Sequence, residues 1–216
     1  MTAPPSLVLR TTLEQATPAL RAASARLWGP PGLTRRYVAY LGAMHGVLRA
    51  SVPLMELAAQ HAGPGPLGGY LRRHILEERG HDGWILADLA AAGVTPDLTA
   101  APPPAVARLV GPQYYWILHH DPVALLGYIA VLEGNAPAPG LAPRIVARTG
   151  LPPGAVRTVR DHAALDVAHA DEVLALLDAL PPTAAQLHTI VLSALSTVGA
   201  LVDLYRYLSD REDNHG

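Results

Sequence analysis

The stretch HAALDVAH, residues 162–169, contains three side chains of the types that bind metal ions. Because an α-helix turns about 100° per residue, His162, Asp166 and His169 would lie within about 60° of arc on one helix face. Three such ligands are more than one ion needs from one helix, and they suit two ions about 3.5–4 Å apart. The spacing therefore predicts part of a two-metal site. The alternative is an exposed polar face on an otherwise apolar helix.

A second set of candidate ligands lies in HILEERGHDGW, residues 74–84. Glu78 and His81 form a Glu-x-x-His pair, which can bind one ion from one helix face. His74 and Glu77 lie on nearly the same face, so the spacing leaves open whether either residue joins or replaces Glu78. The alternative is a solvated patch in which these acids pair with neighbouring arginines.

Glu133, in the stretch VLEG, is the only charged residue between Asp121 and Arg144, and it ends a run that is nearly all apolar. A carboxylate buried in such surroundings costs several kcal/mol unless it is paired or binds a metal. Glu133 is therefore a third candidate ligand position. The alternative is a helix-end glutamate that is exposed beside Gly134.

The elements that must position these residues are helices. Gly and Pro residues divide the chain into helical segments, and alternating strand patterns and hairpin signals are missing. We expect helices at about 10–28, 34–61, 67–92, 104–119, 122–135, 141–149, 153–180 and 183–208. The chain is thus predicted to be an all-α bundle of about seven or eight helices in one domain, 1–216. The metal-site motifs lie within 74–172, and the tail 209–216 is polar.

Composition narrows the class of protein. The 216 residues are 50% hydrophobic and 16% charged, with a net charge of −2, so nothing favours binding to nucleic acid or to an anionic membrane. No apolar run is long enough to predict a transmembrane helix, and the first residues do not resemble a signal peptide, so we expect a cytoplasmic protein. The chain has no Cys, and all 16 of its Lys and Arg residues are Arg. Thiolate ligands and Lys-based chemistry are therefore excluded.

Taken together, the motifs resemble those of the haem-oxygenase-like di-iron oxidases and oxygenases, which are iron-containing redox enzymes with the TenA/PqqC-like helical fold. The signature of that family is Glu-x-x-His on one core helix, a lone Glu on the next, and His-x3-Asp-x2-His on a third. In this chain the same order is given by Glu78–His81, Glu133 and His162–Asp166–His169.

The resemblance implies a haem-oxygenase-like fold in which these six residues bind two Fe(II) ions per chain, with O2 as co-substrate. It implies a non-haem di-iron oxidase or oxygenase that acts in a biosynthetic pathway. Its substrate would be small and carboxylate-bearing, and either amino-acid-like or fatty-acid-like. An external electron donor and a homodimer are compatible with this interpretation.

Substrate contacts are predicted less directly. His45 and Arg49 stand at i and i+4 on one helix, where Arg49 could bind a carboxylate through two hydrogen bonds. Tyr115 belongs to an aromatic cluster that could line a cavity. The alternative for all three residues is a structural role.

Two other functions stay open at this point: a metal-free oxidase of the same fold and a non-catalytic helical binding protein. Haem oxygenases bind haem through a His on their first helix, but residues 1–36 contain no His. The thiaminase-like members use a Cys nucleophile, which this chain lacks. Metal content would separate the predicted enzyme from both alternatives.

Overall fold

The computed structural model describes residues 3–210, apart from the side chain of Val167. Within that range every regular element is a helix, and there is no strand. The helices are α1 (Pro5–Leu27), α2 (Leu33–Ala62), α3 (Pro66–Glu78), α4 (His81–Ala91), α5 (Pro104–His119), α6 (Leu125–Glu133), α7 (Leu141–Thr149), α8 (Arg157–Ala179) and α9 (Ala184–Asp210). Short 3-10 turns, η1 (Pro122–Ala124) and η2 (Pro153–Val156), precede α6 and α8. The predicted all-α class is confirmed; residues 211–216 of the predicted polar tail lie outside the described residues.

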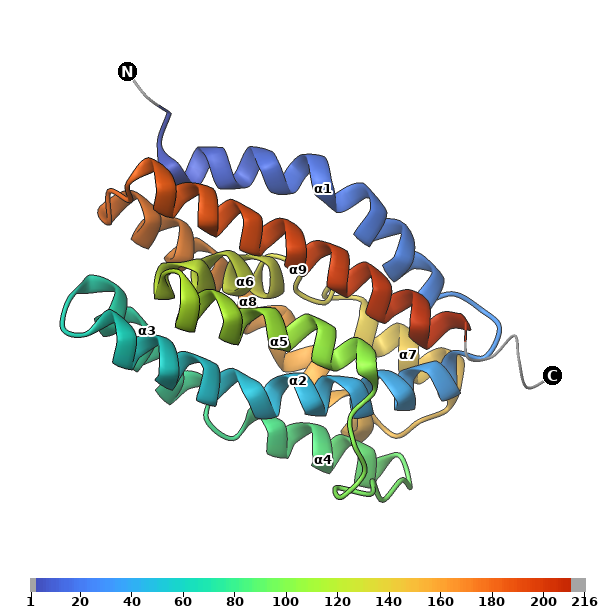
Figure 1. The fold of residues 1–216 in the computed structure, drawn as a ribbon. Coiled ribbons are helices and arrows are strands. Elements are labelled where there is room, and N and C mark those ends of the chain that lie inside the picture. Colours follow the sequence, from blue (N-terminus) through green and yellow to red (C-terminus); the bar gives the residue numbers. More distant parts are fainter. Residues whose placement is uncertain (1–2, 211–216) are drawn as a thin grey trace.

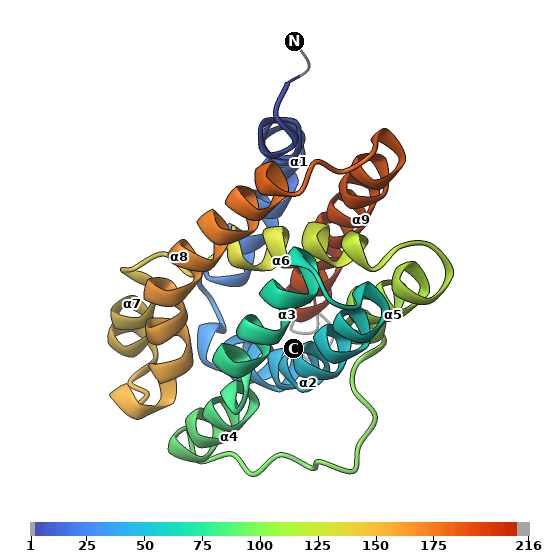
Figure 2. The same ribbon diagram turned by 90° about the vertical axis from the view of Figure 1, so that its left-hand side faces the viewer.

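The helices pack around one continuous apolar core. Figure 1 shows α1 and α9 side by side and running in the same direction, and Arg26 near the end of α1 forms an ion pair of 2.7 Å with Asp210 at the end of α9. The second helix packs against α3, α4 and α5, while α8 packs against α6 (Figure 2).

α6 is the most deeply buried helix, and it positions Glu133 at its end. Every residue from Leu125 to Val131 is buried, as expected for a helix that is apolar on all sides. Gly127 lies so close to α9 that a Cβ atom there would collide with the backbone of Ile190. The small residue therefore allows α6 to pack tightly between α8 and α9.

The predicted helix 67–92 is instead two helices, and this difference bears on the site. Gly80 has a left-handed φ of 95°, which favours glycine, and the preceding Arg79 is extended. Glu78 is therefore the last residue of α3, and His81 is the first residue of α4. The two residues do not share one helix face, although we expected them to.

α9 is long and apolar enough, by length and composition, to cross a membrane. Its buried residues, among them Ile190, Ala194, Leu201 and Leu204, instead pack in the core against α1, α5 and α6. A helix in the core of a protein can have the same length and composition, and its packing identifies α9 as a core helix.

Candidate metal centre

The ends of α3 and α6, the start of α4 and the middle of α8 bring the candidate ligands together. The residues form two groups in which the possible ligand atoms all lie within 4.8 Å of one another. The first group is His74, Glu78, Glu133 and His169, and the second is Glu78, His81 and His162. Glu78 belongs to both groups. Five of the six ligands expected from the sequence are thus in one of the two groups.

The first group is centred on Glu133. One carboxylate oxygen, Oε2, lies 3.2 Å from His169 Nδ1, and the other, Oε1, lies 3.6 Å from His74 Nε2. The two imidazole rings meet edge to face with their centroids 4.8 Å apart. His74 is buried, so of the two residues that the spacing left open it is His74 that lies inside the group.

Glu77 lies at the edge of the first group. Its Oε2 is 3.2 Å from His74 Nδ1 and 3.7 Å from His169 Nε2, but its side chain is 45% exposed. Glu78, in contrast, is buried. Glu77 is therefore placed to orient the two histidines from the solvent side.

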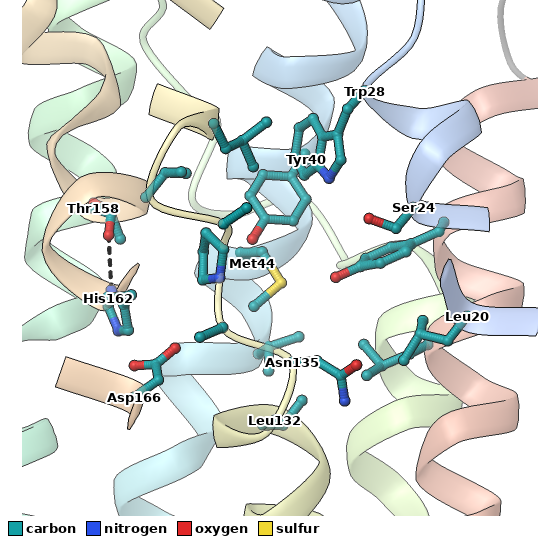
Figure 3. A pocket seen from close by; sticks show the side chains of 18 of the residues that line it. Leu20, Ser24, Trp28, Tyr40, Met44, Leu132, Asn135, Thr158, His162 and Asp166 are labelled. Atoms are coloured by element: carbon teal, nitrogen blue, oxygen red, sulfur yellow. Dashed lines mark hydrogen bonds between the residues drawn. The ribbon is translucent and has the colours of Figure 1, made fainter. Parts of the chain in front are cut away.

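In the second group, His162 is held in one ring orientation. Its Nδ1 lies 2.9 Å from the carbonyl oxygen of Thr158, to which it can donate a hydrogen bond (Figure 3). A ring that donates through Nδ1 keeps a lone pair on Nε2, the form in which histidine binds a metal. His81 lies nearby, with its Nδ1 3.2 Å from Glu78 Oε1.

Three buried atoms at this centre make no hydrogen bond of normal geometry to the described residues: His162 Nε2, Asp166 Oδ1 and His81 Nδ1, although Glu78 Oε1 lies 3.2 Å from the last of them. Buried polar atoms are nearly always satisfied, so three such atoms in one place require an explanation. A metal ion would supply it, because all three are atom types that bind divalent ions such as iron. The residues present therefore fit divalent metal held by nitrogen and oxygen ligands.

Asp166 is buried beside the two groups but belongs to neither. Burial and then the charges of Glu133 and Glu78 raise its pKa to about 8. Its carboxyl group is therefore protonated at neutral pH when no metal is bound.

The other titratable groups of the centre are also shifted. Hydrogen bonding to Glu133 raises the pKa of His169 to about 9. Burial alone would raise the pKa of Glu133, but hydrogen bonds from His169 and His74 lower it to about 2. In the metal-free protein, then, the buried negative charge is balanced by protons on neighbouring side chains.

Asp88 supports this centre from α4, and the sequence analysis missed it. It is fully buried, and its Oδ2 accepts a hydrogen bond of 2.9 Å from the backbone N–H of Thr158 in the first turn of α8. The carbonyl of the same Thr158 holds His162. The available signal was a lone acid in the apolar stretch ILADLA.

Trp84 covers His81 on the outer side. The two rings lie with their centroids 3.9 Å apart, and the guanidinium of Arg157 lies 5.1 Å from the centroid of Trp84. This close contact between the two rings limits the rotation of the His81 ring.

A cavity of about 660 Å³ opens onto the centre, and Glu78, Glu133, His162 and Asp166 line it. Figure 3 shows His162 and Asp166 on one side of the cavity, Leu20 and Ser24 of α1 on the other, and Tyr40 and Met44 between them.

The residues predicted to contact substrate are not among those that line this cavity. His45 is buried in α2, and Arg49 is exposed one turn further along that helix. Tyr115 is 55% exposed on α5, where it contacts Trp116, His119 and His120. Their role as substrate ligands stays a prediction that this cavity does not support.

Comparison with known proteins agrees with this geometry. A family model described as iron-containing redox enzyme matches residues 39–201, well over half of the chain and all of the candidate ligands. No curated protein matches the sequence closely enough to count as a relative.

Two solved structures share the fold. One is a domain of unknown function with a heme oxygenase-like fold from Shewanella denitrificans, with a TM-score of 0.75 and 20% identity, covering 97% of this chain and 90% of that one. The other is a TenA homologue from Pseudomonas syringae pv. tomato, with a TM-score of 0.67 and 15% identity, covering 91% of this chain and 92% of that one. At such identities the likeness concerns the fold alone, and the expected haem-oxygenase-like fold is confirmed.

Proposed function

This chain belongs to the family of iron-containing redox enzymes, and we propose on that premise that it is a non-haem di-iron oxidase or oxygenase. Its substrate would be small and carboxylate-bearing, either amino-acid-like or fatty-acid-like, and the reaction would belong to a biosynthetic pathway. The family supplies the broad class, an iron-containing oxidoreductase. The number of metal ions and the use of O2 are our proposal.

The observation that carries the proposal is the position of Glu78. Its carboxylate lies within reach of both ligand groups, and a carboxylate has two oxygens that can each bind an ion. Two ions that share one carboxylate can lie at the short separation typical of two-metal sites. A single-ion site would not need histidines on both sides of Glu78.

The residues divide between the two ions as the groups do. His74, Glu133 and His169 would hold one ion, His81 and His162 the other, and Glu78 both. Asp166 is buried, and it lies close enough to Glu133 and Glu78 for their charges to raise its pKa further. It would complete the set of ligands. When bound, the two Fe(II) ions would supply the electrons that activate O2.

The protein's own contribution is to hold the ligands in position before the ions arrive. Thr158 fixes the ring of His162, Trp84 restricts His81, and Glu77 orients His74. The candidate ligands have little exposed surface, and four of them line the cavity, so the cavity is the place for substrate.

An anaerobic titration of the purified metal-free chain with Fe(II) tests the proposal, with iron bound per chain as the readout. We expect about two equivalents. The Glu78→Ala variant should lose tight binding of both ions, because both groups use Glu78. The matched control is Glu14→Ala, which removes an exposed acid on α1.

A chain that binds no iron would overturn the proposal and leave the two alternatives, a metal-free oxidase of this fold or a helical binding protein. Binding of one equivalent that is insensitive to Glu78→Ala would overturn the shared-carboxylate arrangement. In the second case the iron dependence of the family would still hold.

A further inference from the structure

We propose that the cavity binds a slender apolar molecule with an anionic head group, and that arginines of α1 and α7 hold the head while the apolar part reaches the ligand cluster. This inference rests on the proposed function for the chemistry, but the binding itself does not require a metal. It goes beyond the proposed substrate class because it names the residues that bind the anion and the direction in which the molecule enters.

The charged residues that line the cavity are divided by sign between different helices, and α1 lies across the cavity from His162 and Asp166 (Figure 3). All its acidic residues, Glu78, Glu133 and Asp166, belong to the candidate metal centre. All its arginines, Arg21, Arg144 and Arg148, come from α1 and α7. Two divalent ions would be largely offset by the three carboxylates, whereas α1 and α7 contribute no acid to the cavity lining.

The three arginines also lack internal partners. Among residues 3–210 none of them forms an ion pair or a hydrogen bond, whereas Arg26, Arg79, Arg157 and Arg160 all pair with acids. Arg144 and Arg148 stand at i and i+4, so their side chains extend from the same face of α7. All three arginines are exposed, and guanidinium groups bind carboxylate and phosphate through paired hydrogen bonds, so these residues suit an anionic head of either kind.

Most of the other residues that line the cavity are apolar. Tyr40, Met44, Val47 and Ser51 of α2 line it, and these positions extend about 16 Å along the helix. Leu20 of α1 and Leu132 of α6 line it from other sides. A cavity of about 660 Å³ is within the range that holds a small organic ligand.

Calorimetry on the metal-free full chain tests the head-group assignment with decanoate, decyl phosphate, decanol and decylamine as probes. We expect decanoate or decyl phosphate to bind more tightly than the two probes without a negative charge, and the tighter of the two identifies the head group. The double variant Arg144→Gln/Arg148→Gln should weaken that binding by about ten-fold or more, because it removes charge-assisted hydrogen bonds. Arg108→Gln, an exposed arginine on α5 outside the cavity, should leave it unchanged.

A separate measurement tests the direction in which the bound molecule lies in the cavity. With the Mn(II)-loaded chain, the terminal methyl protons of decanoate should relax faster than the protons beside the carboxylate, relative to the Zn(II)-loaded chain. Faster relaxation beside the carboxylate would place the head at the metals and overturn the orientation. Equal binding of decanol and decanoate, or an unchanged affinity in the double variant, would overturn the arginine site itself. Because calorimetry uses metal-free protein, a failure of the di-iron proposal would not be mistaken for a failure of this one.

Discussion

At the scale of single residues, two side chains of the proposed metal centre carry protons when no metal is bound. Asp166, with a pKa of about 8, and His169, with a pKa of about 9, are both protonated at neutral pH in the metal-free protein. A metal ion needs the unprotonated forms, so the ions and the protons compete for the same side chains.

Metal affinity should therefore rise with pH. We expect Mn(II) to bind more tightly at pH 8.5 than at pH 6.5, with release of protons on binding, because fewer protons then have to be displaced. Calorimetry in buffers of different ionisation enthalpy measures the protons released. Asp166→Asn should reduce that number by about one at pH 7, whereas Asp97→Asn, which alters an exposed loop acid, should not. A pH-independent affinity would contradict the expectation.

The same pKa shifts determine whether the stability of the metal-free chain rises or falls with pH. The folded-state pKa values of Asp166 and His169 are raised, so their contribution is greatest at low pH and is lost as the pH rises through about 8 and 9. The pKa of Glu133 is lowered to about 2, so its contribution is lost only in strong acid.

At the scale of the elements, the break between α3 and α4 separates Glu78 from His81. The left-handed Gly80 turns the chain so that α4 starts with its first residue beside the end of α3. A side chain at this position would favour continuing one helix instead.

Gly80→Ala should destabilise the protein by about 1–2 kcal/mol, because a left-handed conformation is costly for any residue with a Cβ atom. It should also weaken metal binding by moving His81 relative to Glu78. Urea denaturation and Mn(II) titration measure the two effects. Gly83→Ala is the matched control: the added Cβ meets nothing within 4 Å inside α4, so that variant should be as stable or about 0.5–1 kcal/mol more stable. Equal stability of the two variants would contradict the role of Gly80.

The break also marks a limit of prediction from sequence. Gly80 and Gly83 look alike in a helical pattern, and only the backbone shows that Gly80 ends a helix while Gly83 lies inside one. The all-α class, the order of the helices and the three ligand stretches follow from periodicity and residue type. His45 and Arg49 do not line the cavity, and the sequence could not show this because the direction in which a helix face points depends on tertiary packing.

At the scale of the whole molecule, the centre connects helices that are distant in sequence. The candidate ligands come from α3, α4, α6 and α8, between positions 74 and 169. Asp88 adds a further link, because it joins α4 to the start of α8 over 70 residues of sequence. The sequence does not show which distant residues pair in this way. For that reason neither Asp88 nor the cavity-lining Arg21, Arg144 and Arg148 could be predicted.

Bound metal should therefore stabilise the whole fold. With free Mn(II) at one hundred times its dissociation constant we expect about 2.7 kcal/mol of stabilisation for each bound ion, or a rise in Tm of about 5–10 °C per ion for a chain of this size. Differential scanning calorimetry with and without a chelator measures the shift. Glu78→Ala should abolish it and Glu14→Ala should keep it. A Tm that does not change when metal is added would show that no ion connects these helices.

The position of α1 has a consequence for how relatives of this chain can diverge. Every candidate ligand lies within residues 39–201, the part that defines the family, whereas α1 (Pro5–Leu27) lies before it. Yet Leu20, Arg21 and Ser24 of α1 form one wall of the cavity. Selection can therefore alter this wall of the proposed substrate cavity without changing the candidate metal ligands. We expect a chimera that carries a relative's first helix to change its ligand preference and to bind metal as before.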